Sequence, residues 1–416
     1  MTVAAKAGNE GGRPGTNIWS VPVLTLATFV TMLNAMALGP FLPVMAEDLN
    51  STVSLLGQIP ALSMLLAAAL GLIVGPLADQ FGHRKALIVS LAIAAVSSFA
   101  MGISHFYLAL MFAALVGAGG RAIAQPIAVV IASIHYTGSQ QRRAIGWVSA
   151  GPAGAVVVGI PVMTAIAEFA GWRAAFVGLA GLTVVVLMLA YVTIVRDAQP
   201  KVAKGPPSIG NILAAYRPLV RHRPTLGLIA STLLGGAGIW SAATYVGAFY
   251  DDRFNYSTQQ IGWVYVVPGV ALVAGSIAAG GRLGTVPLRP LVIGMRVLSG
   301  LAFGLLLIAP VSPLGGVGLL GIQGLSTGVA TVAVALLLTT ESPAGRATTM
   351  TLNVVALSLG TALGSALGGF VIAVSGFAAL GLCSFAFSAI SALLLWTHRR
   401  TGPAGSEHGT DVQSTA

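Results

Sequence analysis

Charged side chains are scarce in this sequence, where they make up 8% of 416 residues. A soluble domain carries roughly 25% charged residues, so too few polar side chains are present to cover a globular surface. Hydrophobic residues reach 56% of the chain, and the mean hydropathy is +0.89. The composition therefore excludes one large soluble domain and indicates a protein that crosses a lipid bilayer several times.

Cysteine is almost absent, since Cys383 is the only one. A single cysteine excludes an intrachain disulfide, and no Cys/His cluster indicates a metal site. The sequence also lacks a phosphate-binding P-loop and a nucleophile–base pair, so we expect neither ATP-driven transport nor an enzyme, and no cofactor. The net charge of +10 would favour a nucleic acid partner in a soluble protein, but none is expected in a membrane protein.

Long apolar runs fill most of the chain, and a helix needs about 20 such residues to cross the hydrocarbon layer. We expect an all-α polytopic membrane protein in which twelve transmembrane helices form two pseudo-repeated halves of six. The runs lie near 18–46, 54–77, 86–104, 106–134, 145–167, 174–195, 225–250, 261–282, 290–309, 313–338, 348–374 and 377–396. The expected divisions are an N-terminal tail (1–17), a first half (18–195), a linker loop (196–224), a second half (225–396) and a C-terminal tail (397–416).

Basic residues are distributed unevenly between the loops. With the N-terminus placed inside, the cytoplasmic segments hold 17 of the 21 Lys and Arg residues, whereas the outer loops hold only Arg173 and Arg253. An excess of Lys and Arg marks the cytoplasmic side of a membrane protein. The pattern predicts a multi-pass protein of the plasma membrane, expected to be a bacterial inner membrane, with both termini cytoplasmic. A monomer is expected.

The two halves carry similar segments at similar spacing. GAGGRAIAQ begins at Gly117 and GIQGLSTGV at Gly321, an offset of 204 residues, and Arg143 and Arg346 follow at an offset of 203. Two offsets this close indicate a duplicated unit. Parallel repeats around a central site are a design of membrane transporters.

The segment between the second and third runs, GPLADQFGHRKAL (residues 75–87), carries a specific motif. It resembles the G-x-L-A-D-R-x-G-R-K-x-x-L signature of the major facilitator superfamily, with Gln80 and His83 in place of two usual arginines. Its glycines allow a tight turn and close helix approach, and Asp79 can pair with an arginine or a helix N-terminus. We expect a conformational latch, against the alternative of a positive-inside loop with a solvated aspartate. The latch residues would be Gly75, Asp79, Gly82, Arg84, Lys85, Arg142 and Arg143.

The fifth run, GWVSAGPAGAVVVGIP, resembles in part the antiporter signature G-x-x-x-G-P-x-x-G-G. Gly151 and Pro152 match, whereas Trp147 stands at the first glycine position. A helix with Gly151, Pro152 and Gly154 is expected to bend and to pack tightly. In the family this motif favours exporters.

Arg121 stands in the middle of the fourth run, although a central arginine costs roughly +2.5 to +3.5 kcal/mol on insertion. On a helical wheel it shares a small, polar face with Gln125, so we expect it to point into the bundle. None of the eleven acidic residues lies mid-span to pair with it. Three roles stay open: a structural hub with Gln125, Asn34 and backbone carbonyls, a site for an anionic or carbonyl-rich substrate, and tuning of proton coupling.

Other polar residues at mid-membrane depth follow i, i+3 or i+4 spacing and are candidates for a substrate cavity or for interhelical hydrogen bonds. Arg296, about six residues inside the ninth run, is expected to snorkel to the cytoplasmic face. Tyr250 is expected in the outer aromatic belt or a loop. The candidate cavity residues are Thr31, Asn34, Arg121, Gln125, Trp240, Thr244, Tyr245, Gln323 and Thr327.

The motifs together resemble the drug:proton antiporter and arabinose-efflux branch of the family. The resemblance implies alternating access between two six-helix halves and export of a small organic molecule, such as a drug, sugar or nucleoside-like metabolite. It implies proton antiport driven by the proton gradient, and hence efflux and drug resistance. The alternative is a uniporter or importer of an anionic metabolite that uses Arg121 as the anion site.

Overall fold

The computed structural model describes residues 19–194, 222–280, 286–341 and 346–397, and every element in these ranges is helical. The side chains of residues 72–81, 138–139, 142, 339, 341 and 346–348 are excluded from the description. Helices are expected because only internal hydrogen bonding satisfies backbone groups in lipid. The predicted linker (196–224) and tails (1–17 and 397–416) lie wholly or mostly outside the described residues, so the predicted divisions stay predictions.

The helices before the linker form what we call the N-terminal group. The motif segment (75–87) covers the end of α4, Gly82 and the start of α5, and Arg121 lies in α6. The members are α1 (Ser20–Met36), α2 (Leu38–Asp48), α3 (Val53–Leu56), α4 (Gln58–Phe81), α5 (His83–Gly102), α6 (Tyr107–His135), α7 (Gly138–Gly154), the π-helix η1 (Ala155–Gly159) and α8 (Ile160–Thr193).

The helices after the linker form the C-terminal group. A capping box begins α12, because the Ser257 side chain accepts from the backbone N–H of Gln260 while the Gln260 side chain accepts from that of Ser257. The members are α10 (Arg223–Ala243), α11 (Val246–Phe254), α12 (Thr258–Val264), α13 (Val266–Gly280), α14 (Leu288–Ile308), α15 (Pro313–Glu341) and α16 (Arg346–Thr397).

Nine stretches among the described residues are long and apolar enough to cross a membrane. They become ten when α1 and α2, which meet at a bend of 41°, are taken as one broken span. The prediction of an all-α polytopic membrane protein is therefore confirmed.

Two of these stretches are long enough to hold two predicted spans each. Gly171 interrupts α8 with φ 80°, and Gly376 interrupts α16 with φ 76°, so the backbone leaves the helical conformation at both positions. Glycine reaches this region without the steric cost that a side chain adds. Dividing both stretches at these glycines would give the twelve predicted spans, a count that stays a prediction.

Glycines at four-residue spacing let α10 and α16 approach closely. Gly360, Gly364 and Gly368 each face a backbone carbonyl of α10, and a Cβ at Gly364 would overlap the carbonyl oxygen of Ala237. Small residues at such spacing allow the backbones of membrane helices to come together. This glycine column, which is not among the motifs identified in the sequence, joins the first and the last helix of the C-terminal group.

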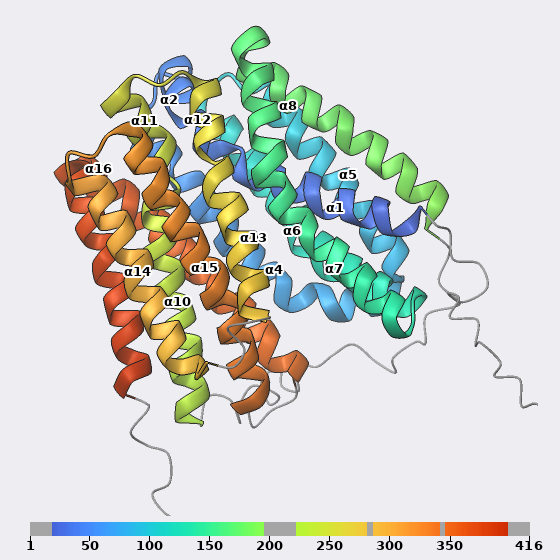
Figure 1. The fold of residues 1–416 in the computed structure, drawn as a ribbon. Coiled ribbons are helices and arrows are strands. Elements are labelled where there is room, and N and C mark those ends of the chain that lie inside the picture. The colour runs from blue at the N-terminus through green and yellow to red at the C-terminus, as the bar shows by residue number, and fades with distance from the viewer. Residues whose placement is uncertain (1–18, 195–221, 281–285, 342–345, 398–416) are drawn as a thin grey trace, which may run out of the picture.

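The two groups meet at one end of the bundle, which we call the closed end. There α2 packs against α11 and α12, and α12 also packs against α8, as the upper part of Figure 1 shows. One continuous cluster of buried apolar side chains crosses the junction, with Leu38 and Phe41 from one group and Val246 and Phe249 from the other. Burial of apolar surface thus holds this end together where it is shielded from water.

Hydrogen bonds also cross the junction at the closed end. The Ser54 hydroxyl donates to the carbonyl oxygen of Gly369, and Gln58 Nε2 donates to the carbonyl oxygen of Ala366 at 3.1 Å. These bonds connect α3 and α4 to the middle of α16.

The opposite end of the bundle, where α10 begins, is arranged differently. The buried apolar cluster found there contains residues of the C-terminal group alone, among them Leu228, Val292 and Leu338. In Figure 1 the ends of α4 and α7 diverge from those of α10 and α14 at this end. The described parts of the two groups therefore pack together mainly at the closed end.

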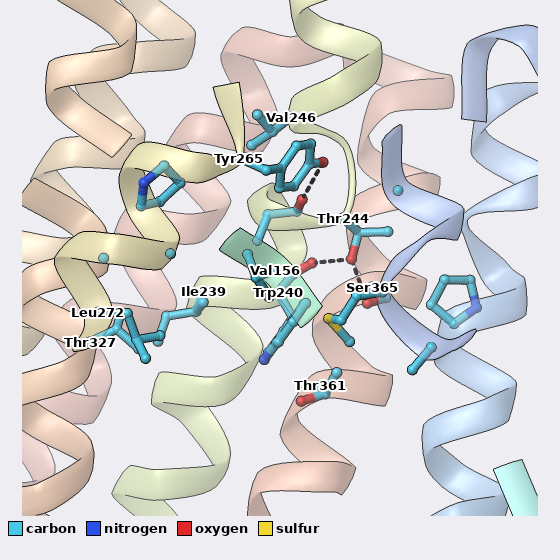
Figure 2. Close-up of a pocket in the computed structure, with 18 of the residues that line it drawn as sticks. Val156, Ile239, Trp240, Thr244, Val246, Tyr265, Leu272, Thr327, Thr361 and Ser365 are labelled. Carbon is cyan, nitrogen blue, oxygen red and sulfur yellow. Dashed lines mark hydrogen bonds between the residues drawn. The ribbon is translucent and has the colours of Figure 1, made fainter. Parts of the chain in front are cut away.

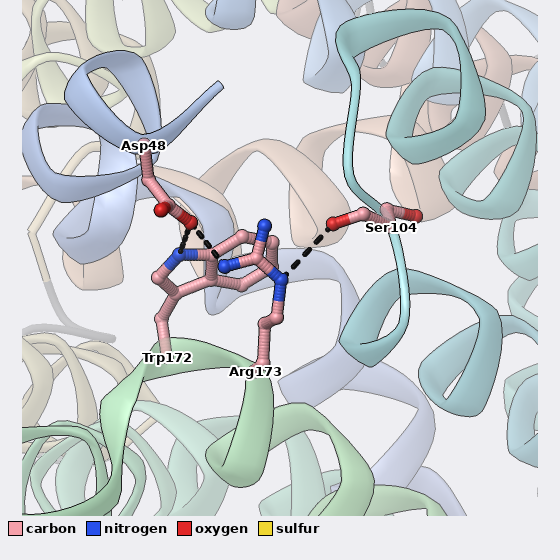
Figure 3. A network of polar contacts seen from close by, with 4 residues as sticks. All are labelled: Asp48, Ser104, Trp172 and Arg173. Carbon is pink, nitrogen blue, oxygen red and sulfur yellow. Dashed lines mark hydrogen bonds and ion pairs between the residues drawn. The ribbon is translucent and has the colours of Figure 1, made fainter. Parts of the chain in front are cut away.

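A polar network fixes the closed end of the N-terminal group itself. Trp172 Nε1 donates to Asp48 Oδ2 at 2.9 Å, and Arg173 Nη1 forms an ion pair with the same oxygen. Arg173 Nε also donates to the carbonyl oxygen of Ser104 at 3.1 Å (Figure 3). The network ties the end of α2 to the turn after α5 and to the break in α8.

Tyr250 corrects one prediction from the sequence. Its side chain is fully buried in the apolar cluster at the closed end, and its hydroxyl donates to the carbonyl oxygen of Pro313 at 3.3 Å. The aromatic-belt prediction was wrong for this residue because neighbouring helices cover it on all sides.

Candidate functional site

A cavity of about 320 Å³ lies between the two helix groups. That volume is near the lower limit for pockets that bind small organic molecules. Its wall is contributed by α1, α2, α4, α6 and the η1 region on one side and by α10 to α16 on the other. We call it the central cavity.

Six of the nine predicted cavity residues line the central cavity. They come from both helix groups, and their proximity in space could not be predicted from local sequence. They are Asn34, Arg121, Trp240, Thr244, Gln323 and Thr327.

The other three predicted residues do not line it. The Thr31 hydroxyl donates to the carbonyl oxygen of Ala27 at 2.8 Å, as hydroxyls in helices often do. Tyr245 is buried instead at the closed end, where its hydroxyl donates to the carbonyl oxygen of Ser365 at 2.8 Å. Gln125 lies one turn beyond Arg121 and is exposed. Helical spacing predicts which residues share one face of a helix, but it does not predict whether that face borders the cavity or packs against another helix.

Trp240 and Thr244 form the part of the wall contributed by the end of α10 (Figure 2). The Thr244 hydroxyl lies 2.8 Å from the carbonyl oxygen of Trp240 and 2.8 Å from the Ser365 hydroxyl. Tyr265, which the sequence analysis missed, donates its hydroxyl to the carbonyl oxygen of Ala243 at 3.4 Å. The indole nitrogen of Trp240 has no hydrogen-bond partner among the described residues, so it can donate to a molecule in the cavity.

The polar residues of α15 are largely satisfied by one another. Gln323 Nε2 donates to the Thr327 hydroxyl at 2.9 Å, and the Thr331 hydroxyl donates to the carbonyl oxygen of Thr327 at 2.8 Å. Between α10 and α16, the Thr232 hydroxyl donates to Asn353 Oδ1 at 2.9 Å. These hydroxyls therefore offer few unused hydrogen atoms.

Arg121 lines the cavity from α6 and is partly buried. Among the described residues it makes no hydrogen bond and no ion pair. No described hydrogen bond joins it to Asn34, whose Nδ2 donates instead to the Ser98 hydroxyl at 2.8 Å. The predicted hub with Gln125 and Asn34 is thus not formed, and the guanidinium is available to water or a ligand.

The position of Arg296 contradicts the prediction that this residue reaches the cytoplasmic face. It does not snorkel to the membrane surface, because its side chain is only 5% exposed and lines the central cavity from α14. Its Nε is buried, and no described residue forms a hydrogen bond with it. A Cβ on Gly235 of α10 would overlap the guanidinium carbon, so the missing side chain at Gly235 makes room for Arg296.

The charge of the cavity wall is one-sided. Arg121 and Arg296 line it, and no Asp or Glu does so among the described residues. The same part of the chain holds no group of three His, Cys, Asp or Glu side chains that could bind a metal ion. The cavity therefore presents unused hydrogen-bond donors and positive charge within a largely apolar wall.

The predicted latch is described only in part. Gly82 has φ 90°, which fits the tight turn between α4 and α5. Arg84 Nη2 donates to the carbonyl oxygen of Tyr191 at 2.5 Å, and its guanidinium carbon lies 5.0 Å from the centre of the Tyr191 ring. Lys85 and Arg143 are exposed. The side chains of Asp79 and Arg142 and the surroundings of Gly75 lie outside the described set, so the latch stays a prediction.

The fifth predicted span changes its helical hydrogen bonding next to Pro152. Here α7 ends at Gly154 and the π-helix η1 follows at once. Proline removes one backbone donor and disturbs the helix around it. Gly151 lies against α1, where a Cβ would overlap the Thr28 hydroxyl, and that hydroxyl donates to the carbonyl oxygen of Val148 at 2.9 Å.

Comparison with protein families agrees with this architecture. The family model described as Major Facilitator Superfamily matches residues 24–351 and, in a second alignment, residues 250–414. The chain is also 24% identical over 401 residues to Inner membrane transport protein YdhP of Escherichia coli (strain K12), with 92% of this chain and 97% of that protein covered.

Two further proteins are similar over most of the chain. Transcription regulatory protein OpdE of Pseudomonas aeruginosa is 29% identical over 390 residues, which cover 89% of this chain and 92% of that protein. The crystal structure of a mutant of nucleoside transporter NupG superimposes with a TM-score of 0.72 at 15% identity, and covers 91% of this chain and 99% of that one. At this identity the second likeness shows the fold alone.

Proposed function

Since the chain belongs to the Major Facilitator Superfamily, we propose that it exports a small organic molecule by alternating access in exchange for protons. The family resemblance seen in the sequence is confirmed, and the established part of the function is transport by a multi-pass membrane protein rather than enzymatic catalysis. Direction, energy source and substrate are the proposed part.

The central cavity is the observation that supports alternating access. It lies between two helix groups whose described residues pack together mainly at one end. A carrier needs such a site, reached from one side at a time. With both termini cytoplasmic, as the Lys and Arg distribution predicts, the closed end would face outward and the cavity would be reached from inside.

Export and proton antiport rest on sequence resemblance. The partial antiporter motif around Pro152 favours an exporter, and a bacterial inner membrane is supported by the printed description of YdhP. No acidic side chain lines the cavity in the described part of the chain, so the proton-binding residue would lie elsewhere. Asp48 is already held by Trp172 and Arg173, which leaves Glu47, Asp79 and Glu341 as boundary candidates.

The second candidate is a uniporter or importer of an anionic metabolite that uses Arg121 as the anion site. One observation favours it, namely a cavity wall that carries arginine and no described carboxylate. A wall of this charge disfavours organic cations.

The predicted latch belongs to the same proposal. Asp79 lies at the end of α4 that diverges from the C-terminal group, where a latch could hold one state of the cycle. We expect Asp79→Asn to reduce transport strongly, whereas unchanged turnover would count against the latch.

Everted membrane vesicles test the proposed function directly. Uptake of neutral, cationic and anionic compounds is measured under an imposed pH gradient, with and without a protonophore. Export by antiport predicts uptake that the protonophore abolishes. Uptake of anions alone, indifferent to the pH gradient, would overturn antiport and favour the second candidate.

A further inference from the structure

We infer that Arg121 and Arg296 together bind the anionic group of an amphipathic organic anion inside the central cavity. The inference rests on the proposed function, because it takes the central cavity as the substrate site, and it names the class of substrate. The two arginines come from different helix groups, α6 and α14, and line the same cavity.

Arg296 carries the argument because its position is built into the packing. The side chain is only 5% exposed and its Nε has no hydrogen-bond partner among the described residues, although a buried guanidinium normally forms charge-assisted hydrogen bonds. Gly235 on the neighbouring helix leaves the space that the guanidinium occupies. A cation kept in a largely apolar environment without a counter-ion indicates that an anion binds there in another step of the cycle.

Arg121 supplies a second charge to the same cavity from the N-terminal group. It also makes no ion pair or hydrogen bond among the described residues. Trp240 adds an indole N–H that no described residue accepts. The wall therefore offers unused donors on both arginines and on Trp240, which matches a ligand that is rich in acceptors, such as a carboxylate, sulfonate or phosphate group.

The rest of the wall defines the body of the ligand. Ile239, Leu272, Phe303 and Leu320 line the cavity together with the Trp240 ring. Such a wall binds an aromatic or aliphatic body by excluding water from apolar surface. A small, strongly hydrated inorganic ion would leave this surface unused, so the organic anion fits better.

Binding by both arginines would connect the substrate to the transport cycle. An anion held at once by α6 and α14 bridges the N-terminal and C-terminal groups, so its binding energy favours the state in which the two arginines come closest. A neutral molecule of the same shape lacks this effect.

The test uses three compounds with one body: phenylbutyrate, phenylbutyramide and phenylbutylamine, with the corresponding naphthyl series for a larger body. Equilibrium binding to the purified full-length protein is measured in detergent and in nanodiscs. We expect the carboxylates to bind, and the amides and amines to bind at least tenfold more weakly. Equal binding of amide and carboxylate, or no carboxylate binding at millimolar concentration, would overturn the inference.

Variants of the two arginines separate binding from folding. Arg296→Met and Arg121→Met keep most of the side-chain volume and remove an unpaired charge, so the apparent melting temperature should stay the same or rise. Carboxylate affinity should fall about tenfold to a hundredfold in each, and Arg296→Lys should recover part of it. Gly294→Ala on the same helix, where a Cβ meets open space, is the matched control and should bind normally.

The outcomes also separate this inference from the proposed function. Carboxylate binding that needs both arginines, together with absent proton-driven export, would overturn the proposed direction and leave the inference standing. Proton-driven transport of a neutral compound that survives in Arg296→Met would support the proposed function and overturn the inference. A lower melting temperature in both Met variants, with unchanged carboxylate affinity, would assign the arginines to structure alone and overturn it too.

Discussion

Gly235 of α10 lies directly against the guanidinium of Arg296 of α14. A Cβ at Gly235 would overlap the guanidinium carbon and its neighbouring nitrogens, so the glycine and the arginine form one structural unit. This pairing explains how a charged side chain reaches a position in the cavity wall that its depth in α14 did not predict.

Gly235→Ala should displace the Arg296 guanidinium without changing any charge. We expect carboxylate affinity to fall about tenfold, because a charge-assisted hydrogen bond that is misplaced contributes little. Binding of the phenylbutyrate series measures the effect, with Gly294→Ala as control. Unchanged affinity in Gly235→Ala would show that Arg296 does not need its observed position.

Gly364→Ala should destabilise the C-terminal group, because the added methyl would overlap the carbonyl oxygen of Ala237 in α10. Overpacking of this kind typically costs about 1–3 kcal/mol. Gly318→Ala is the control, since its Cβ meets open space and alanine favours the helix by roughly 0.5–1 kcal/mol. Apparent melting temperatures should therefore move in opposite directions, and a lowering of both would contradict the close-contact explanation.

Asp48 should act in stability rather than in proton coupling. Asp48→Asn keeps an acceptor for Trp172 Nε1 but weakens the pair with Arg173, and both charged side chains are partly exposed. We expect a loss of at most about 0.5 kcal/mol for Asp48→Asn and about 1 kcal/mol for Asp48→Ala. Loss of proton-driven transport in a normally stable Asp48→Asn protein would identify Asp48 as the proton carrier instead.

The closed end should exclude thiol reagents from outside. In a Cys383→Ser background, Thr331→Cys places a thiol on the exposed cavity side of α15, and Thr164→Cys places one in a buried position facing Gly262. An impermeant maleimide should label Thr331→Cys in everted vesicles and should not label Thr164→Cys in intact cells. Labelling of Thr331→Cys in intact cells but not in everted vesicles would show that the closed end faces inward.

Gln58 should help to keep the two groups together. Gln58→Leu removes the donor to the Ala366 carbonyl oxygen and keeps a similar volume. A hydrogen bond contributes about 0.5–1.5 kcal/mol, so the population opened at this end should rise up to about tenfold. Faster external labelling of Thr164→Cys in the Gln58→Leu protein measures the change, and an unaltered rate would assign closure to apolar packing alone.

The sequence predicted those parts of the fold that depend on local pattern. Apolar runs gave the spans, and the helical wheel gave the face of α6 on which Arg121 lies. Gly171 and Gly376, where the backbone leaves the helical conformation, fall within the short separations between predicted spans. Glycine permits the non-helical turn found at both positions.

What depends on a partner helix could not be predicted in this way. Arg296 was placed at the membrane surface because depth along one helix does not reveal Gly235 on another. Tyr245 and Tyr250 were placed in the cavity and the aromatic belt, yet both are buried at the closed end. The column of Gly360, Gly364 and Gly368 was visible in the sequence, but its partner α10 was not.

The apolar junction of the closed end has a thermodynamic consequence. Because Leu38, Phe41, Val246 and Phe249 are buried together there, opening that end would transfer apolar surface to water. Such a transfer raises the heat capacity, so the free-energy difference between the two facing states must curve with temperature. The van't Hoff plot of the conformational equilibrium, and with it the Arrhenius plot of the transport rate, would then be curved rather than linear even where the chemistry of the substrate is unchanged.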